Sequence, residues 1–541
     1  MTTAAEALVK VLLAEGVTHV YCVPGESYLA VLDALGAVSD RIATITCRHE
    51  SAAANMAAAH GKLTGRPGIC MVTRGPGATQ ASVGLHTARQ DSAPMILFIG
   101  QVARAHKGRE AFQEMDYGAL FGSVAKSVVD VDDEHRLQDV VSRGFETARG
   151  GRMGPVVIAL PEDMLRQPVA DVPTHATVLK PVALSARSLG DIAARLAQAE
   201  RPVLILGGSG WREDALVKLA GWIEKLGLPV ALTFRRKDLI DNNHPCYAGD
   251  LGLGPNPALL ERIRGADLVL ALGTRLGDIA TQGYRLFKPE ETGRRLIHIH
   301  PDAAEIGRVW PCLIGAAADV NLAAEALCGI TPERDWRGAA AEAHASHEAF
   351  TGPAPVTGAV NLSEVFGHMA HVLPPDTMVS NGAGNYTAWL HRFYRHRRFG
   401  TQLGPTSGAM GFGLPAAIAA KLAYPVREAV AVAGDGCFLM AAQELATAMQ
   451  HGVKVIVLVI DNGSLGTIRM HQERDYPGRV SATDLANPDF VALARSFGCR
   501  AALVERTEDF PAALADARGQ NVTTLLHIKT SLRDIAPGKT L

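Results

Sequence analysis

The chain has 541 residues, of which 48% are hydrophobic and 20% are charged. This length exceeds what one core of roughly 100–200 residues needs, so we expect three domains. Charge is nearly balanced, with 53 Lys and Arg against 55 Asp and Glu. Without a basic surface field, composition argues against a nucleic-acid partner and against binding to an anionic membrane.

Eight cysteines are spread along the chain without a CxxC pair. This pattern predicts reduced, mostly buried thiols and neither a zinc site nor a disulfide scaffold. Residues 1–17 carry Glu6, Lys10 and Glu15 at helical spacing, which predicts an amphipathic helix and not a signal peptide. The longest strand-like apolar runs are too short to span a bilayer. We therefore expect a cytoplasmic protein.

Short apolar runs alternate with helical stretches, which predicts parallel strands buried on both faces. The runs lie at residues 68–72, 95–100, 156–160, 203–206, 268–272, 296–299, 429–433 and 455–460. We expect the α/β fold class, with three doubly wound parallel-sheet domains. Proline-rich and polar segments place them at residues 1–175, 186–332 and 358–541. Residues 333–357 are rich in Ala, His and Pro without a clear apolar face and predict a linker.

In the third domain, two polar segments each follow a buried strand. Asp435 stands in a Gly-Asp-Gly segment, and Asn462 stands in an Asp-Asn-Gly segment after the next strand. Neighbouring parallel strands bring such ends together, where α/β folds bind ligands. Carboxylate and amide oxygens suit Mg²⁺ or Ca²⁺, and the glycines let backbone N–H groups approach a phosphate. Either segment alone is more often a simple turn, but the pair predicts a site for a metal and a diphosphate.

These two segments resemble the diphosphate motif of thiamine-diphosphate (ThDP) enzymes. The resemblance implies that Asp435 and Asn462 bind Mg²⁺ through their side chains and Ser464 through its backbone carbonyl. It also implies a pyrimidine-binding N-terminal domain, a Rossmann-like central domain and a diphosphate-binding C-terminal domain. The implied cofactor contacts in the third domain are Gly384, Asn385, Tyr386, Gly408, Met410, Gly434, Gly436, Cys437, Leu465 and Gly466. Met410 is the expected apolar wedge that bends the cofactor, a role that suits an unbranched thioether.

Glu50 follows a short strand at residues 42–46 and opens an Ala-rich helix. A carboxylate there could be poorly solvated, which raises its pKa toward the range useful for proton transfer. From spacing alone, the favoured interpretation is a helix start in which Glu50 stabilises the helix dipole. Enzymes similar to acetolactate synthase carry His-Glu at this place, and their glutamate bonds the aminopyrimidine ring of ThDP. The resemblance therefore implies that Glu50 is catalytic, with the thiazolium ring as an electron sink.

Other segments of the first domain resemble the same enzymes. Pro24 and Gly25 match a turn on the cofactor side, and Gly75 opens a Gly-Pro-Gly-Ala-Thr loop. Phe112 and Gln113 match a Phe-Gln-Glu segment that lines the substrate site, which implies a role in catalysis. In these enzymes the glutamate domain of one subunit faces the diphosphate domain of another. The resemblance thus implies a homodimer or homotetramer with active sites at the subunit interface.

The central domain carries glycine-rich turns after two strands, at residues 206–210 and 273–276. Such a turn alone is a weak dinucleotide signal. In acetolactate synthases the corresponding domain binds FAD without using its redox chemistry. Here residues 247–252 replace the expected Met-Leu-Gly loop. Both FAD and a vestigial or ADP-like site remain open.

Several positions depart from the biosynthetic acetolactate synthases. His471 aligns with the tryptophan that selects the larger acceptor, and Arg74 replaces a small residue before the glycine loop. Either could bind an acceptor carboxylate, while Lys126 matches a lysine expected near the acceptor site. Residues 533–538 lack the Pro-Met-x-Pro tail. The sequence also lacks the His-His pair of pyruvate decarboxylases and the glycine-loop histidine of benzoylformate decarboxylases.

The resemblance favours a decarboxylating carboligase of the acetolactate-synthase type. Its substrates would be a 2-oxo acid donor and an aldehyde or 2-oxo acid acceptor. A non-oxidative 2-oxo acid decarboxylase or a ThDP-dependent lyase is the alternative, and a flavin-linked oxidase is a further one. The sequence does not name the donor or the acceptor.

Overall fold

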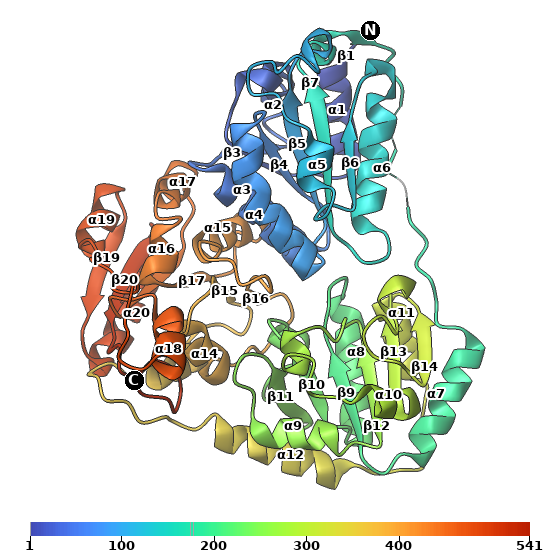
Figure 1. Cartoon of the computed structure of the whole chain (residues 1–541), viewed down its shortest axis with the longest axis vertical. Helices are drawn as coiled ribbons and strands as arrows, with labels where there is room; N and C mark the ends of the chain where they lie inside the picture. The colour runs from blue at the N-terminus through green and yellow to red at the C-terminus, as the bar shows by residue number, and fades with distance from the viewer. Residues whose placement is uncertain (1, 174, 177) are drawn as a thin grey trace.

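The computed structural model describes residues 2–173, 175–176 and 178–541. They form three lobes, each built around a six-stranded parallel sheet flanked by helices (Figure 1). This arrangement confirms the predicted α/β class with three parallel-sheet units. All the predicted strands are present, and their bounds differ from the predicted ones by at most one residue at either end.

The N-terminal sheet has the strand order β3-β2-β4-β5-β7-β6. Its strands are β2 (His19–Cys22), β3 (Ala43–Thr46), β4 (Gly68–Val72), β5 (Met95–Gln101), β6 (Ser127–Asp130) and β7 (Pro155–Pro161). Its helices are α1 (Ala4–Ala14), α2 (Leu29–Gly36), α3 (Glu50–Thr64), α4 (Pro76–Asp91), α5 (Tyr117–Phe121) and α6 (Leu137–Arg149). An antiparallel ribbon of β1 (Thr2–Thr3) and β8 (Pro168–Val169) joins the two ends of this lobe.

Helix α1 confirms the amphipathic helix predicted at the N-terminus. Thr3 and Glu6 form a reciprocal capping box, in which each side chain accepts from the other residue's backbone N–H. The cap satisfies N–H donors that the first helical turn leaves unpaired. Leu8, Val11 and Leu12 are fully buried on the inner face, so the helix is fixed against the sheet by both its cap and its apolar stripe.

The central sheet has the strand order β11-β10-β9-β12-β13-β14. Its strands are β9 (Pro202–Leu206), β10 (Val230–Thr233), β11 (Tyr247–Leu251), β12 (Leu268–Leu272), β13 (Leu296–His300) and β14 (Ile314–Ala317). Its helices are α7 (Ala186–Gln198), α8 (Glu213–Leu226), α9 (Pro257–Arg264), α10 (Pro289–Arg295) and α11 (Val320–Leu327). Numbered along the chain, this order is 3-2-1-4-5-6, the arrangement of dinucleotide-binding sheets.

The C-terminal sheet has the strand order β16-β15-β17-β18-β20-β19. Its strands are β15 (Met378–Asn381), β16 (Gln402–Leu403), β17 (Ala429–Gly434), β18 (Ile456–Asp461), β19 (Arg500–Val504) and β20 (Thr524–Lys529). Its helices are α13 (Leu362–Val372), α14 (Tyr386–Phe393), α15 (Gly413–Ala423), α16 (Asp435–Leu439), α17 (Glu444–Gln450), α18 (Gly466–Asp475), α19 (Phe490–Ser496) and α20 (Phe510–Gly519). In chain order this is 2-1-3-4-6-5, the same order as in the N-terminal sheet.

The segment 333–357, predicted as a linker, contains the helix α12 (Arg337–Phe350). The helix runs along the base of the molecule between the central and C-terminal lobes (Figure 1). Its buried face consists of Ala340, Ala343 and His347. These side chains lack the large periodic apolar groups by which an amphipathic helix is recognised in a sequence, which explains why the helix was not predicted.

The N-terminal and C-terminal lobes of the chain share one apolar core, in which α3 packs against α15. Polar contacts accompany this packing: the Glu444 carboxylate accepts from the backbone N–H of Arg48 at 3.1 Å. No helix in the described part of the chain is both long and apolar enough to cross a membrane.

Candidate active site

The two predicted metal-binding segments lie side by side at the carboxyl edge of the C-terminal sheet. β17 and β18 are paired in parallel, with Gly434 opposite Ile460. Asp435 therefore begins α16 directly after β17, and Asn462 follows β18. The apolar strands fix these positions because their side chains are buried on both faces of the sheet.

A cavity of about 240 Å³ opens at this edge. Its lining includes every residue of the third domain that the sequence predicted for the cofactor or the metal. These are Gly384, Asn385, Tyr386, Gly408, Met410, Gly434, Asp435, Gly436, Cys437, Asn462, Ser464, Leu465 and Gly466. The fold thus gathers residues from four separate loops around one cavity.

Asp435 is buried and held by hydrogen bonds on both oxygens. Oδ1 accepts from the backbone N–H of Gly436 at 2.9 Å, and Oδ2 accepts from the Asn487 side-chain amide at 2.8 Å. The same amide donates to Asp461 Oδ1 at 2.9 Å, and Asp461 Oδ2 lies 2.8 Å from His527 Nε2. Burial raises the pKa of Asp435. Burial also acts to raise the pKa of Asp461, but the hydrogen bonds from His527 and Gly463 outweigh it and lower that pKa to about 2.

The donor set at the cavity suits a hard cation shared with a phosphate. Asp435 offers a carboxylate, Asn462 an amide oxygen, and Ser464 a backbone carbonyl, since its hydroxyl donates to Thr483 O. No group of three or more His, Cys, Asp or Glu side chains within the described residues could hold a metal ion. A cation here would need ligands from a bound anion as well, which is how Mg²⁺ is usually held beside phosphates.

Glycines allow close approach at the cavity wall. A Cβ on Gly384 would stand 2.8 Å from the Tyr386 ring, and the backbone there has φ of +141°. A Cβ on Gly436 would stand 3.0 Å from Leu465. Larger residues would therefore displace the Tyr386 and Leu465 side chains, which line the cavity.

The N-terminal lobe presents Glu50 at the carboxyl edge of its own sheet. Glu50 is the first residue of α3, after the His49 cap, and its side chain is partly exposed. A Cβ on Gly77 would stand 3.4 Å from Glu50 Oε1. The predicted Gly25 turn follows β2 of the same sheet, and Pro24 is exposed beside it. Glu50 and the glycine loop therefore lie together in the N-terminal lobe.

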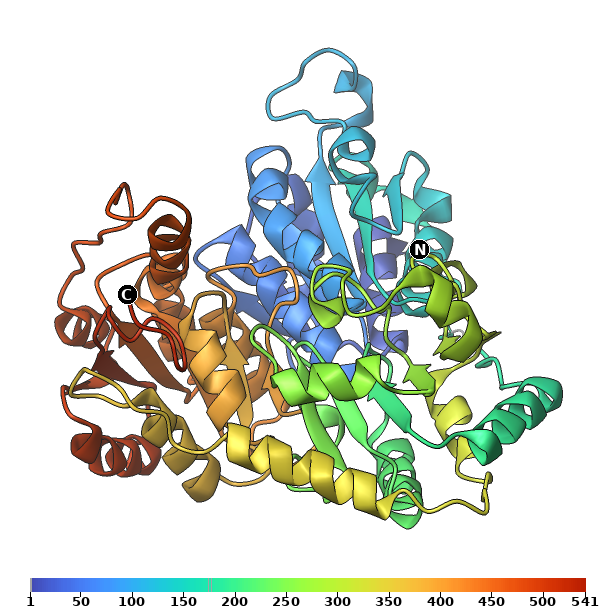
Figure 2. The same cartoon turned by 60° about the horizontal axis from the view of Figure 1, so that its bottom comes forward.

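Gln113 is packed against the same glycine loop. A Cβ on Gly75 would collide with the Gln113 carbonyl at 2.7 Å, so this loop requires glycine. The Gly75 N–H donates to the Tyr117 hydroxyl at 3.2 Å. Phe112 is 74% exposed on the segment between β5 and α5, which projects from the body of the molecule (Figure 2). Gln113 and Phe112, the residues predicted to line the substrate site, thus lie on an exposed part of the N-terminal lobe.

Within one chain, the Glu50 group of the N-terminal lobe does not contribute to the cavity that Asp435 and Asn462 line. None of the described residues that line the cavity of the C-terminal lobe comes from the N-terminal lobe. Glu50 and Gln113 stand at the edge of one sheet, while Asp435 and Asn462 stand at the edge of another.

Family models match all three lobes. They are the thiamine pyrophosphate enzyme N-terminal TPP binding domain at residues 2–120, the central domain at 189–327 and the C-terminal TPP binding domain at 382–528. The chain belongs to the thiamine pyrophosphate enzyme family. It is therefore a ThDP-dependent enzyme of the acetolactate-synthase-like type, as the relatives below support.

Three relatives illustrate the similarity to acetolactate synthases. The chain is 32% identical to an acetolactate synthase of Mycobacterium bovis, covering 96% of this chain and 86% of the relative. It is 30% identical to the acetolactate synthase isozyme 2 large subunit of Escherichia coli, over 97% and 95%. It is 33% identical to a probable acetolactate synthase large subunit of Methanocaldococcus jannaschii, over 97% and 91%.

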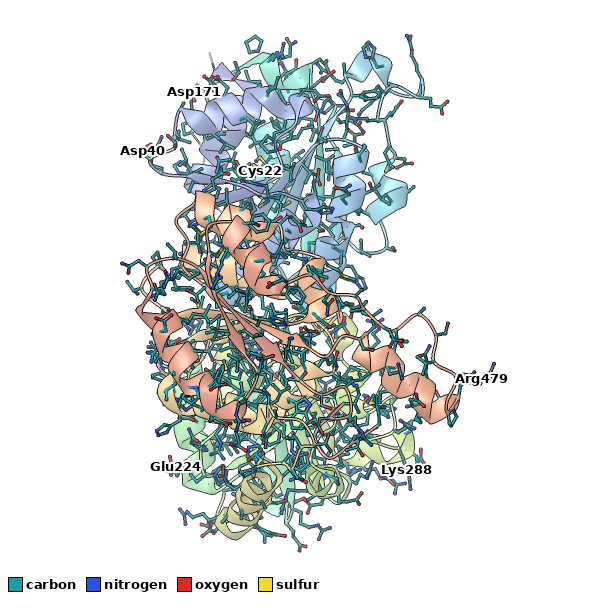
Figure 3. All side chains as sticks on the ribbon, turned by 90° about the vertical axis from the view of Figure 1, so that its left-hand side faces the viewer. Cys22, Asp40, Asp171, Glu224, Lys288 and Arg479 are labelled. Atoms are coloured by element: carbon teal, nitrogen blue, oxygen red, sulfur yellow. The ribbon has the colours of Figure 1, made fainter. Side chains whose placement is uncertain are left out.

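The structure places three further positions that the sequence analysis connected with the acceptor, and their roles there stay a prediction. Arg74 is buried and pairs with Glu162 at 3.0 Å and Glu26 at 3.6 Å, so carboxylates of the chain already neutralise it. Lys126 donates to the Gly150 carbonyl at 2.5 Å and lies away from the glycine loop, at the side facing the central lobe. His471 is exposed on α18. Figure 3 shows this part of the C-terminal lobe projecting outward, with Arg479 at its tip.

The structure adds residues that the sequence did not indicate. Asp461 directly precedes Asn462, so its place beside the cavity could have been inferred. Asn487 and His527 come from a later loop and from β20, and no local pattern marks them. Their contacts with Asp461 join segments that are distant in the sequence, so only the three-dimensional structure reveals them.

Proposed function

We propose that the protein is an Mg²⁺-dependent 2-oxo acid decarboxylating carboligase, joining a 2-oxo acid donor to an aldehyde or 2-oxo acid acceptor. The observation that carries this proposal is the single cavity that gathers Asp435, Asn462 and Ser464 with the glycine-rich loops. Its donors suit a cation bridging to a diphosphate. The similarity to acetolactate synthases over nearly the whole chain supports the carboligase outcome.

ThDP, when bound, supplies a nucleophilic carbon and an electron sink for the carbanion that loss of CO₂ leaves. The residues of the chain would do the rest. Asp435 and Asn462 would fix the cation, and Met410 would support the cofactor from the cavity wall. Glu50 would exchange a proton with the pyrimidine ring, as a general acid and base. Gln113 and Phe112 would shape the space for the second substrate.

We further propose that two copies of the chain complete each active site, in a homodimer or a homotetramer. The apolar side chains beside both half-sites support this, since Leu29 and Phe112 on one lobe and Met440 and Ile468 on the other are each at least half exposed. Exposed apolar groups gathered near a site are typical of a protein interface. A second copy would cover them and bring its Glu50 to the cavity.

Mixing two inactive variants tests this pairing. Glu50→Gln and Asp435→Ala chains, denatured and refolded together, would form mixed dimers in which one site keeps both intact residues. About a quarter of wild-type activity should return, because half the dimers are mixed and each has one complete site. Activity no higher than that of the separate variants would contradict the proposed pairing.

Incubation with pyruvate, ThDP and Mg²⁺ tests the reaction itself. Acetolactate as product supports the carboligase, and acetaldehyde alone would support the alternative of a non-oxidative decarboxylase. If neither forms, a mass-spectrometric screen of 2-oxo acids and aldehydes separates another donor from a lyase. A substrate-bleached yellow colour would instead favour a flavin-linked oxidase.

We also propose that the central lobe binds an anionic nucleotide, for which FAD and ADP are the candidates. A cavity of about 990 Å³ lies between the N-terminal and central lobes, and Arg152, Arg236 and Arg275 are among its lining residues. Its wall includes glycine turns after β9 and β12, packed so tightly that a Cβ on Gly208 would stand 1.9 Å from the Gly273 carbonyl. Such turns let a backbone approach a phosphate. Absorbance and mass spectra of ligand released from the purified protein would identify it; a protein without bound nucleotide that also binds neither FAD nor ADP would contradict the proposal.

A further inference from the structure

Arg235 belongs to the central lobe but reaches into the C-terminal lobe. It lies in the turn after β10, its side chain is almost completely buried at 2% exposure, and its backbone is left-handed with φ of +59°. This conformation costs free energy in any residue other than glycine and is retained where the surrounding structure requires it. One terminal nitrogen donates to the Pro405 carbonyl, and the other donates to the Gly382 carbonyl at 2.9 Å.

Both carbonyls stand at the start of loops that line the cofactor cavity. The loop after Gly382 carries Gly384 and Asn385, and the loop after Pro405 carries Gly408 and Met410. The aliphatic part of Arg235 packs tightly against the second loop, where a Cβ on Gly404 would stand 2.9 Å from Arg235 Cδ. One guanidinium therefore ties together two loops that come from different parts of the C-terminal lobe.

Arg235 also carries a charge that no carboxylate of the described chain contacts directly, although its guanidinium lies 4.7 Å from the centre of the Phe234 ring. Nearby, Lys62 pairs with Asp91 at 3.1 Å and Arg236 lies 3.6 Å from Asp238. Arg235 forms no ion pair with any described residue, and its Nε lacks a hydrogen-bond partner. Burial lowers the pKa of Arg235 to about 10, so the group stays positive at neutral pH.

We propose that Arg235 is a positioning residue for the diphosphate end of the cofactor, a role that rests on the proposed ThDP site. It holds the two cavity loops in register through their carbonyls. Its positive charge, close behind the wall formed by Tyr386 and Cys437, favours an anion in the cavity. Charge effects of this kind are strong inside a protein, where water does not screen them.

Lys237 provides a matched control. It lies two residues further along, is also 2% exposed, and donates to two carbonyls of the C-terminal lobe, those of His391 and Tyr394. Those carbonyls belong to the end of α14 and the residue after it, which do not line the cavity. Arg235→Met and Lys237→Met thus each remove a buried cation that donates to two carbonyls; Lys237 also lies 4.0 Å from Asp250 Oδ1, and only Arg235 contacts the cofactor loops.

The test measures ThDP binding in the presence of Mg²⁺ by calorimetry, together with the melting temperature of the apo-protein. Both variants should melt at a lower temperature. Only Arg235→Met should raise the dissociation constant of ThDP, by roughly tenfold or more, because bonds to charged groups contribute about that much. Arg235→Lys, which keeps the charge and can reach one carbonyl, should recover part of the affinity. The KM for ThDP should rise more than kcat falls.

Equal effects of Arg235→Met and Lys237→Met on the ThDP dissociation constant would overturn the proposal, as would wild-type affinity in Arg235→Met. If Arg235→Met does not fold, Arg235→Lys carries the test, and wild-type affinity in that variant overturns the proposal. Failure of the wild-type protein to bind ThDP at all would overturn the proposed function together with this inference. Wild-type binding with unaffected variants would overturn only the role of Arg235.

Discussion

The N-terminal and C-terminal sheets have the same strand order but present different halves of a site at the same edge. In the C-terminal sheet, the loops after β17 and β18 border a cavity whose described lining comes from the C-terminal lobe alone. In the N-terminal sheet, the loop after β4 packs against Gln113, and Glu50 stands beside it on an open surface. The fold therefore supplies a common edge, and the loops decide which chemistry it carries.

The comparison also separates what is preformed from what needs a partner. Asp435 is held on both oxygens by hydrogen bonds from the chain's own Gly436 and Asn487. Phe112, in contrast, is exposed on a projecting segment. We infer that the anchoring half is rigid and the proton-transfer half is completed by assembly. The predictions below test each half, from the largest expected effect to the smallest.

Removing the carboxylate from the open half should abolish turnover and leave cofactor binding intact. We predict that Glu50→Gln lowers kcat by a factor of about 10²–10⁴, the range that a positioned acid–base group contributes. Calorimetry should show a ThDP affinity close to wild type. Glu26→Gln is the control, since this exposed carboxylate at the same edge contacts Arg74 instead. Wild-type kcat in Glu50→Gln would refute its catalytic role.

Removing the carboxylate from the preformed half should abolish cofactor binding instead. We predict that Asp435→Ala weakens Mg²⁺-dependent ThDP binding by at least about a hundredfold, or ~2.7 kcal/mol. Titration of the apo-protein with ThDP at fixed Mg²⁺ measures this. The far-ultraviolet circular dichroism should be unchanged, because the strand before Asp435 keeps its packing. If the wild-type protein bound ThDP equally well with and without Mg²⁺, the role of Asp435 as a metal ligand would be contradicted.

Asn487 should matter less than the ligand that it orients. Its amide bridges Asp435 and Asp461, and loss of a residue that orients a metal ligand costs about ten- to a hundredfold in metal affinity. We predict that Asn487→Ala weakens Mg²⁺ binding in the ThDP complex by about tenfold. Asn243→Ala, an exposed asparagine of the central lobe, is the control. An unchanged Mg²⁺ affinity in Asn487→Ala would show that Asn487 does not orient the metal ligand.

The smallest effect concerns the contact between the two lobes. Burial raises the pKa of Glu444, which accepts from the backbone N–H of Arg48 at the start of α3. The pKa of Glu444 is higher in the folded state than in the unfolded state, so protonation of this carboxyl favours folding. That contribution to the free energy of unfolding is present at low pH and is lost as the pH rises through the folded-state pKa. We predict that the melting temperature of Glu444→Gln, relative to wild type, rises between pH 4 and 8 by a few degrees at most, because the wild-type carboxylate must ionise in a buried site. A difference that does not change with pH would contradict the assignment.

Much of this architecture follows from local sequence patterns. Buried strands were predicted from apolar runs, because a parallel strand covered on both faces must be apolar along its length. Asp435 and Asn462 were predicted to meet because each follows such a strand. Helix α12 was missed, since Ala and His on its buried face give no apolar period.

Contacts between distant segments could not be predicted in this way. The carbonyl partners of Arg235 lie 170 and 147 residues further along the chain. Nothing near Arg235 indicates that its side chain leaves the central lobe. Asn487 likewise stands in a loop whose local residues indicate only a turn. The contacts of such residues depend on how distant segments pack together, and no local periodic pattern in the sequence reveals that packing.

The loop at residues 404–406 is held at each residue by an earlier part of the chain. Lys62 donates to the Gly404 carbonyl, Arg235 to the Pro405 carbonyl, and Asp91 accepts from the Thr406 backbone N–H. During synthesis these three side chains leave the ribosome long before the loop does, and domains generally fold in that order. The first two lobes would thus fold before this loop and hold it in place, just ahead of Gly408 and Met410 in the lining of the cavity.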